Sequence, residues 1–226
     1  MDIIWLFVML FGLLVFGVPV AVSLAGASAV FIFANGSPPT MVVAHRMING
    51  VDSFPLLAVP FFILAGNLMN TAGITERIFN FALAMVGWMR GGLGHVNVGA
   101  SVIFAGMSGA AVADAGGLGA IEIKAMRDAG YDAKFAVGIT AASSTIGPII
   151  PPSLPMVIYG VVAGTSIGQL FVAGFIPGLL MAVALMVMIA IMARTRGFGR
   201  DQAFYWPVLF STFRRAFLSL LTPVII

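Results

Sequence analysis

The stretch GGLGHVNVGASVIFAGMSGAAVADAGGLGAIEI, Gly91 to Ile123, decides how this chain folds. It is 33 residues long and stands between Arg90 and Lys124. As one helix it would extend roughly 50 Å at about 1.5 Å per residue, against a bilayer hydrocarbon core of roughly 30 Å. Two complete crossings would need about 40 residues and a turn. The length therefore predicts a hairpin that enters a membrane, turns near the midplane at Met107 to Ala110 and leaves on the side from which it came.

The composition is that of an integral membrane protein. Hydrophobic residues make up 61% of the chain, charged residues only 8%, and the mean hydropathy is +1.10, whereas soluble domains are about 25% charged. The net charge is +3, but the 11 basic residues are scattered over several loops. They suit orientation in a lipid bilayer and exclude a nucleic-acid surface. Because there is no cysteine, disulfides and thiolate metal sites are excluded.

The first apolar segment, Ile3 to Ala34, has no lysine or arginine ahead of it and is longer than the core of a signal peptide, so we expect it to be retained. Gly17-Val18-Pro19 predicts a kink, because proline removes a helix hydrogen bond. Whether the segment makes one kinked span or two stays open. Phe54 to Met69 predicts a short crossing, and Thr71 to Arg90 predicts an amphipathic helix that lies along the membrane surface.

A second break follows the hairpin. The apolar segment Ala133 to Val162 contains ASSTIGPIIPPS, Ala142 to Ser153. Three prolines and a glycine within six residues cannot continue an α-helix, so the segment predicts two half-helices around an unwound stretch. Because freed backbone groups at membrane depth need a polar cavity, we expect Ser108 and Gly147 to lie near each other at the midplane.

The charges of the later segments fit this layout. Ile167 to Ala193 predicts an ordinary span, followed by a basic loop to Gln202, an interfacial stretch from Tyr205 to Phe217, and the start of another apolar run at Leu218. If the hairpin opens to the cytoplasm, the positive-inside rule places seven basic residues on one side. They are Arg90, Lys124, Arg127, Lys134, Arg194, Arg196 and Arg200.

Two polar stretches are candidate sites. Ser108 to Gly119 is rich in glycine where lipid favours apolar side chains; close helix packing explains small residues, but an intramembrane carboxylate at Asp114 indicates function. Asp114 alternatively caps backbone N–H groups of the hairpin turn, and both roles stay open. Ser143 to Ser153 is either a proline kink or a set of hydroxyls beside freed carbonyls. Oxygen donors of that kind suit a hard cation.

Three motifs in order carry a family resemblance: FAGMSGAAVAD at Phe104 to Asp114, Gly130-Tyr131, and TIGPIIPPS at Thr145 to Ser153. Over essentially the whole chain they resemble the large membrane subunit of tripartite ATP-independent periplasmic (TRAP) transporters, C4-dicarboxylate permease type. The resemblance implies an all-α, multi-pass, elevator-type permease of the bacterial inner membrane that imports a C4-dicarboxylate-like organic acid with sodium. It also implies two partners, a periplasmic solute-binding protein and a small four-helix membrane subunit.

The resemblance assigns roles to regions and residues. Residues 1–70 would be scaffold helices, 71–90 an arm helix, 91–129 the re-entrant hairpin, 130–166 the broken transmembrane helix of a transport domain, and 167–226 a scaffold helix, a basic loop and the start of a truncated helix. Asp114 would be a structural or outer-shell group. The coupling ion, Na⁺, would be held by hydroxyls and carbonyls of Ser108, Gly109, Ser144, Thr145, Gly147, Ile150 and Pro152.

The length departs from that family, whose members carry a second, inverted copy of hairpin and broken helix. This chain ends at Thr222 to Ile226, where the second half would begin. We therefore expect the first half of an inverted-repeat transporter, with the missing half as a further partner. Inverted repeats place substrate and ions at the repeat interface, so this half holds about half of the site.

Two other functions share parts of this pattern. Gly106-Met107-Ser108-Gly109 matches the Gly-x-Ser-Gly pattern of rhomboid intramembrane proteases, whose serine needs a histidine base on a later helix. Both histidines, His45 and His95, precede Ser108, so we expect no enzyme. A channel would share the polar hairpin but would need an open pathway. The broken helix favours a carrier.

Overall fold

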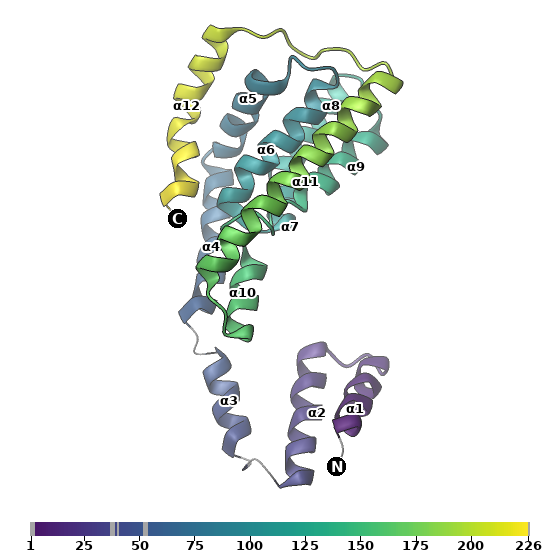
Figure 1. The fold of residues 1–226 in the computed structure, drawn as a ribbon, viewed down its shortest axis with the longest axis vertical. Helices are drawn as coiled ribbons and strands as arrows, with labels where there is room; N and C mark the ends of the chain where they lie inside the picture. Colours follow the sequence, from purple (N-terminus) through teal and green to yellow (C-terminus); the bar gives the residue numbers. More distant parts are fainter. Residues whose placement is uncertain (1–2, 37–38, 40, 52–53, 226) are drawn as a thin grey trace. The chain divides into compact units, whose positions relative to one another are not determined.

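The computed structural model describes residues 3–36, 39, 41–51 and 54–225, and within these ranges every regular element is a helix (Figure 1). The predicted all-α class is confirmed for this part of the chain. The chain divides into two compact units, Met1–Phe54 and Pro55–Ile226. Each unit is described by itself.

The first unit contains α1 (Ile3–Val15), α2 (Val20–Asn35) and α3 (Met41–Val51). α1 and α2 pack against each other, as Figure 1 shows. The sequence left open whether this segment makes one kinked helix or two, and the structure has two helices. The physical reason is local, because Gly17 takes a left-handed backbone with φ +78° and Pro19, directly ahead of α2, cannot continue the preceding hydrogen-bond ladder.

The second unit is built around one buried helix. α6 packs against α5, α8, α9 and α11, and nearly all of its residues are buried. The helices of this unit are α4 (Phe54–Thr71), α5 (Ile74–Val86), α6 (Gly92–Ser108), α7 (Ala111–Gly116), α8 (Leu118–Asp128), α9 (Ala133–Ser144), α10 (Leu154–Ala163), α11 (Ile167–Thr195) and α12 (Trp206–Ile225).

The apolar face predicted for the arm helix packs against other helices of the second unit. Ile78 and Ala82 of α5 are fully buried, and α5 packs on both α6 and α12. The Phe81 and Phe213 rings meet at 5.8 Å between α5 and α12. α12 runs without a break through the interfacial stretch and the apolar run after it, and it packs on α5.

α11 is the predicted ordinary span. Among the residues that the structure describes, it is the single helix that is both long and apolar enough to cross a bilayer, judged by length and composition. Large side chains remain exposed along it, including Val172, Ile176, Leu180 and Val187. An exposed apolar surface of this extent is typical of contact with lipid or another subunit.

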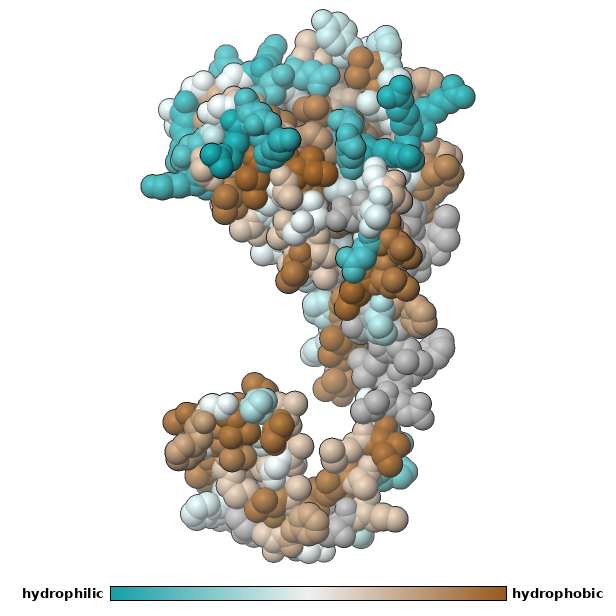
Figure 2. All heavy atoms as spheres, turned by 180° about the vertical axis from the view of Figure 1, so that it is seen from behind, coloured by the Kyte–Doolittle hydropathy of each residue, from teal (hydrophilic) through white to brown (hydrophobic). Residues whose placement is uncertain are grey.

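The basic segments meet at one end of the second unit, where hydrophilic side chains gather in Figure 2. Gly91 N–H donates to the Gly199 carbonyl at 2.9 Å, and Arg90 and Arg200 form an isolated antiparallel bridge. The Asp201 carboxylate accepts hydrogen bonds from Leu93 N–H and from the Tyr131 hydroxyl. The two flanks of the hairpin and the basic loop therefore lie on the same side, as charge parity predicts.

An aromatic cluster fixes this end. The Tyr131 and Phe198 ring centroids are 4.7 Å apart, and Phe135 lies 5.2 Å from Phe198. The Tyr131 hydroxyl donates to Asp201 at 2.6 Å. Burial, followed by this hydrogen bond to a carboxylate, raises the pKa of Tyr131 above its usual value. The neutral phenol is thus favoured in the folded state.

We expect Tyr131→Phe to lower the free energy of unfolding by about 1.5 to 3 kcal/mol at neutral pH, the usual worth of a hydrogen bond to a charged group. Because the folded-state pKa is raised, this contribution is complete below about pH 10 and is lost as pH rises further. Denaturant unfolding in detergent at pH 7 and above pH 10 measures both effects. Tyr159→Phe, at a tyrosine that is 61% exposed, is the control, and equal losses at the two positions would contradict the assignment.

Candidate functional site

The hairpin turn lies where the sequence predicts it. α6 ends at Ser108, Gly109 takes φ +59°, and Ala110 is extended before α7 begins. The Gly109 carbonyl accepts a hydrogen bond of 3.2 Å from Leu154 N–H. A Cβ atom on Gly109 would stand only 2.3 Å from the Pro152 carbonyl oxygen. Both the backbone angle and this close approach require glycine.

The helix break is also confirmed. α9 ends at Ser144, and α10 begins after Ser153, whose hydroxyl accepts from Met156 N–H and donates to the Pro148 carbonyl. A Cβ on Gly147 would lie 3.5 Å from the Ala110 carbonyl carbon. The turn of the hairpin and the unwound stretch therefore touch, as expected. Their depth in a membrane stays a prediction.

The predicted sodium residues fall into two groups. Ser108, Gly109, Gly147 and Pro152 lie where the turn meets the break. Ser108 is 2% exposed, and its hydroxyl has no hydrogen-bond partner among the described residues. An orphaned buried hydroxyl needs a partner, and a hard cation accepts such an oxygen ligand.

The other predicted residues are placed differently. The Ser144 and Thr145 hydroxyls each donate at 2.6 Å to a carbonyl of their own chain segment, at Thr140 and Ala142. Their oxygen lone pairs remain available to a cation, although Thr145 is exposed. Ile150 is buried, and its side chain fills the space beside Gly178 of α11, where a Cβ would be 2.4 Å away. Ile150 therefore holds the unwound stretch against α11.

A cavity of about 450 Å³ adjoins the turn. It is bordered by α4 on one side and by the hairpin and the start of α10 on the other. Its lining comprises Ile63, Gly66, Asn67, Phe104, Ser108, Ala110, Val112, Ala113, Gly116, Gly117 and Leu154. The cavity gives the orphaned Ser108 hydroxyl a space beside which a small ligand fits.

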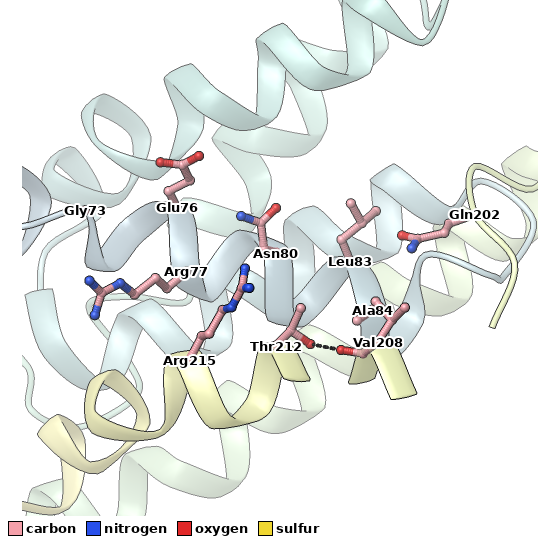
Figure 3. Close-up of a pocket in the computed structure, with 10 residues that line it drawn as sticks. All are labelled: Gly73, Glu76, Arg77, Asn80, Leu83, Ala84, Gln202, Val208, Thr212 and Arg215. Atoms are coloured by element: carbon pink, nitrogen blue, oxygen red, sulfur yellow. Dashed lines mark hydrogen bonds between the residues drawn. The ribbon is translucent and has the colours of Figure 1, made fainter. Parts of the chain in front are cut away.

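A second cavity is larger but lies elsewhere. It measures about 650 Å³ and lies between α5 and α12 (Figure 3). The Arg215 side chain extends toward Asn80 in this view, and the Thr212 hydroxyl donates to the Val208 carbonyl at 2.8 Å. None of the predicted sodium residues lines it. We therefore place the candidate site at the smaller cavity.

The structure adds a buried network that sequence reasoning missed. Asn97 of α6 donates through Nδ2 to the Thr140 hydroxyl at 2.7 Å, and the Ser143 hydroxyl donates to Asn97 Oδ1 at 2.6 Å. These three side chains are buried and join the hairpin to the broken helix. The sequence signal that could have revealed it is an amide side chain in the middle of an apolar run.

Asp114 does not cap the turn. It is 1% exposed, neither carboxylate oxygen has a hydrogen-bond partner among the described residues, and α7 has no side-chain cap. The reason is register: α7 begins at Ala111, so Asp114 lies within the helix, whereas a capping carboxylate must precede it. Ser101 and Glu122, which the sequence did not single out, are buried and unpartnered in the same way.

The geometry also bears on the protease alternative. His95 and Ser108 lie on the same helix, and their separation of 13 positions corresponds to roughly 20 Å along its axis. His45 belongs to the first unit, where its ring contacts Asn49. His95, the histidine of the second unit, therefore cannot activate Ser108 within this chain.

Comparison with known proteins gives a consistent family. Residues 7–226 match the family described as "Tripartite ATP-independent periplasmic transporter, DctM component". The sialic acid TRAP transporter large permease protein SiaM of Vibrio cholerae is 56% identical over 95% of this chain and 50% of its own length. The sialic acid permease protein SiaT of Haemophilus influenzae is 52% identical over 99% and 36%. The C4-dicarboxylate permease protein DctM of Vibrio cholerae is 37% identical over 100% and 50%. The chain thus spans about half the length, or less, of these curated relatives.

Proposed function

This chain belongs to the DctM component family of the tripartite ATP-independent periplasmic transporters, and on that premise we propose that it supplies one half of the transport site of a sodium-coupled importer of organic acids. The relatives are transport permeases rather than enzymes. The observation that carries the proposal is the contact between two backbone breaks, at Gly109 and Pro152, beside a cavity of about 450 Å³. Broken elements that meet at a cavity are typical of secondary-transporter binding sites.

Sodium is the ion that this chemistry suits. The unpartnered Ser108 hydroxyl and the carbonyls around Gly109, Gly147 and Pro152 offer oxygen ligands without thiolate or imidazole. Leu154, the first residue of α10, lines the same cavity. The positive end of that helix dipole favours an anionic substrate group. Ion and substrate would then stabilise each other's binding.

The substrate proposed is a small organic acid, and sialic acid is the first to test. Two relatives with more than half of their aligned residues identical are named for sialic acid, whereas the relative named for C4-dicarboxylates is 37% identical. The narrower expectation of a C4-dicarboxylate is therefore widened to carboxylates. Competition by sialic acid and by succinate against labelled sialic acid uptake measures the preference.

The remaining expectations follow from the family. The complete permease would span the bacterial inner membrane, with the basic end of the second unit in the cytoplasm. It would work with a periplasmic solute-binding protein, a small membrane subunit and the second half of the large subunit. The hairpin and the broken helix would move, while the first unit, α4 and α11 would be scaffold. Crosslinks from α1 to the small subunit should then leave transport intact, unlike crosslinks within the hairpin.

We expect Ser108→Ala or Thr145→Ala to raise the sodium concentration for half-maximal uptake by roughly 5- to 150-fold, a coupling loss of about 1 to 3 kcal/mol. Ser108 has no internal hydrogen bond to lose, so its replacement should leave stability without sodium unchanged. Uptake into proteoliposomes that hold the complete permease with its partners, under imposed sodium or proton gradients, measures this.

Ser211→Ala, at an exposed serine of α12, is the control for this experiment. Transport that ignores sodium, or that neither substitution alters, would leave the ion site without support. Non-saturating flux without a gradient requirement would indicate a channel instead.

A further inference from the structure

A second polar centre lies inside the hairpin. Ser101 of α6, Asp114 of α7 and Glu122 of α8 are 0%, 1% and 1% exposed. None of the oxygens of these three side chains has a hydrogen-bond partner among the described residues. Native proteins leave few buried polar atoms unpaired, so three such groups on neighbouring helices need an explanation.

The three groups lie on helices that pack against one another. α6, α7 and α8 are in mutual contact, and within these contacts Asp114 is a neighbour of both Ser101 and Glu122. The Ser101 and Asp114 oxygens still do not meet hydrogen-bond geometry. A Cβ on Gly119, between the two carboxylates in sequence, would lie 3.6 Å from the Asp114 carbonyl oxygen and 2.6 Å from Thr140 Cγ2. The centre is thus closed on one side by α9.

Other buried polar side chains near this centre are hydrogen-bonded to one another. Asn97, one helical turn before Ser101, exchanges hydrogen bonds with Thr140 and Ser143. The unpaired oxygens beside this network are therefore not the product of loose packing. They lie next to a hydrogen-bonded network between the hairpin and α9 without taking part in it.

The charge of this centre is unbalanced. The basic residues closest in sequence, Lys124 and Arg127, are exposed, and neither carboxylate is hydrogen-bonded to a basic side chain of the described residues. Burying two uncompensated carboxylates is strongly unfavourable, because each of them loses its hydration. Only a bound cation or proton removes that penalty. Within the described residues no third acidic or histidine ligand joins the pair, which disfavours a divalent metal.

We propose that Ser101, Asp114 and Glu122 bind one sodium ion inside the hairpin, separate from the ion at the turn. Two carboxylates and a hydroxyl are the hard oxygen donors that such an ion accepts. One sodium ion and one carboxyl proton leave the centre neutral. Because the three ligands come from α6, α7 and α8, the ion ties together the two arms of the hairpin. The observations behind this site do not depend on the ion site at Ser108, and each site can be tested without the other.

The test counts sodium ions bound by the purified complete permease, with labelled sodium at equilibrium in detergent. Asp114→Asn and Glu122→Gln preserve side-chain volume and remove one charge each. Each should bind one sodium ion fewer than the wild type. Ser108→Ala should lose a different ion, so the Ser108→Ala, Asp114→Asn double variant should lose two. Asp128→Asn, at an exposed carboxylate of α8, is the control and should lose none.

Unfolding temperature supplies the second readout. In choline chloride, Asp114→Asn and Glu122→Gln should unfold at the same temperature as the wild type or higher, because an unpaired buried charge is removed. In sodium chloride the wild type should gain more than either variant. Unchanged ion counts would overturn the proposal, and so would variants that unfold in choline where the wild type stays folded. Failure of Ser108→Ala alone to lose an ion would count against the turn site and leave this one standing.

Discussion

Gly109→Ala is expected to abolish substrate uptake and to lower the free energy of unfolding of the permease by about 2 to 5 kcal/mol. A left-handed backbone costs a residue with a Cβ about 1 to 2 kcal/mol, and Gly109 has φ +59°. The added Cβ would also stand 2.3 Å from the Pro152 carbonyl oxygen, and overpacking costs about 1 to 3 kcal/mol. The turn and the unwound stretch must then separate, and the candidate site opens. Proteoliposome uptake and chemical unfolding measure the two effects.

Gly164→Ala is a closely matched control. Gly164 also ends a helix in the left-handed region, with φ +64°, but nothing lies within 4 Å of its Cβ position. It should lose only the backbone contribution of about 1 to 2 kcal/mol and retain uptake. If both substitutions weaken the permease equally, the contact between Gly109 and Pro152 has no special role.

Asn97→Ala is expected to lower the free energy of unfolding by about 2 to 4 kcal/mol. Asn97 makes two buried hydrogen bonds, to the Thr140 and Ser143 hydroxyls, and each buried group left without a partner costs about 1 to 3 kcal/mol. The Ser143 hydroxyl keeps a weaker alternative at the Thr140 carbonyl, 3.1 Å away, which limits the loss. Because the network joins the hairpin to α9, uptake should also fall. Denaturant titration in detergent gives the stability change.

Asn49→Ala controls for the loss of an amide as such. The Asn49 side chain is exposed and forms a hydrogen bond with the His45 ring, so its removal should change stability by less than about 0.5 kcal/mol. A small effect at Asn97, comparable with that at Asn49, would show that water replaces the network and that it does not hold the two elements together.

Local chemistry explains why the breaks could be predicted. The turn at Gly109 follows from a glycine in the left-handed region, and the interruption between Ser144 and Leu154 follows from three prolines and a glycine within six residues, which cannot continue the helix hydrogen bonds. The same reasoning left Gly17 to Pro19 undecided between a kinked helix and two helices. A glycine and a proline interrupt a helix there too, but whether the chain bends or folds back depends on the packing of α1 against α2, which periodicity does not reveal.

The candidate site was predicted only in part, because motifs reveal local breaks but not contacts between helices. Ser108, Gly109, Gly147 and Pro152 were identified from motifs, and the structure brings them together. Asp114 was noticed because a carboxylate is costly in lipid, yet its surroundings could not be inferred. Its neighbours Ser101 and Glu122 come from other helices.

The sequence by itself determined the helical class, the apolar segments, the end of α6 at the hairpin turn and the end of α9 at the unwound stretch. These features depend on backbone sterics and side-chain polarity within a few residues. Only the tertiary structure decided which breaks touch, which hydroxyls and carboxylates are left without partners, and that α12 continues along α5. Those properties arise from contacts between residues far apart in the chain, such as Gly109 with Pro152 and Asn97 with Ser143. Their free energy depends on a three-dimensional arrangement that no single segment specifies.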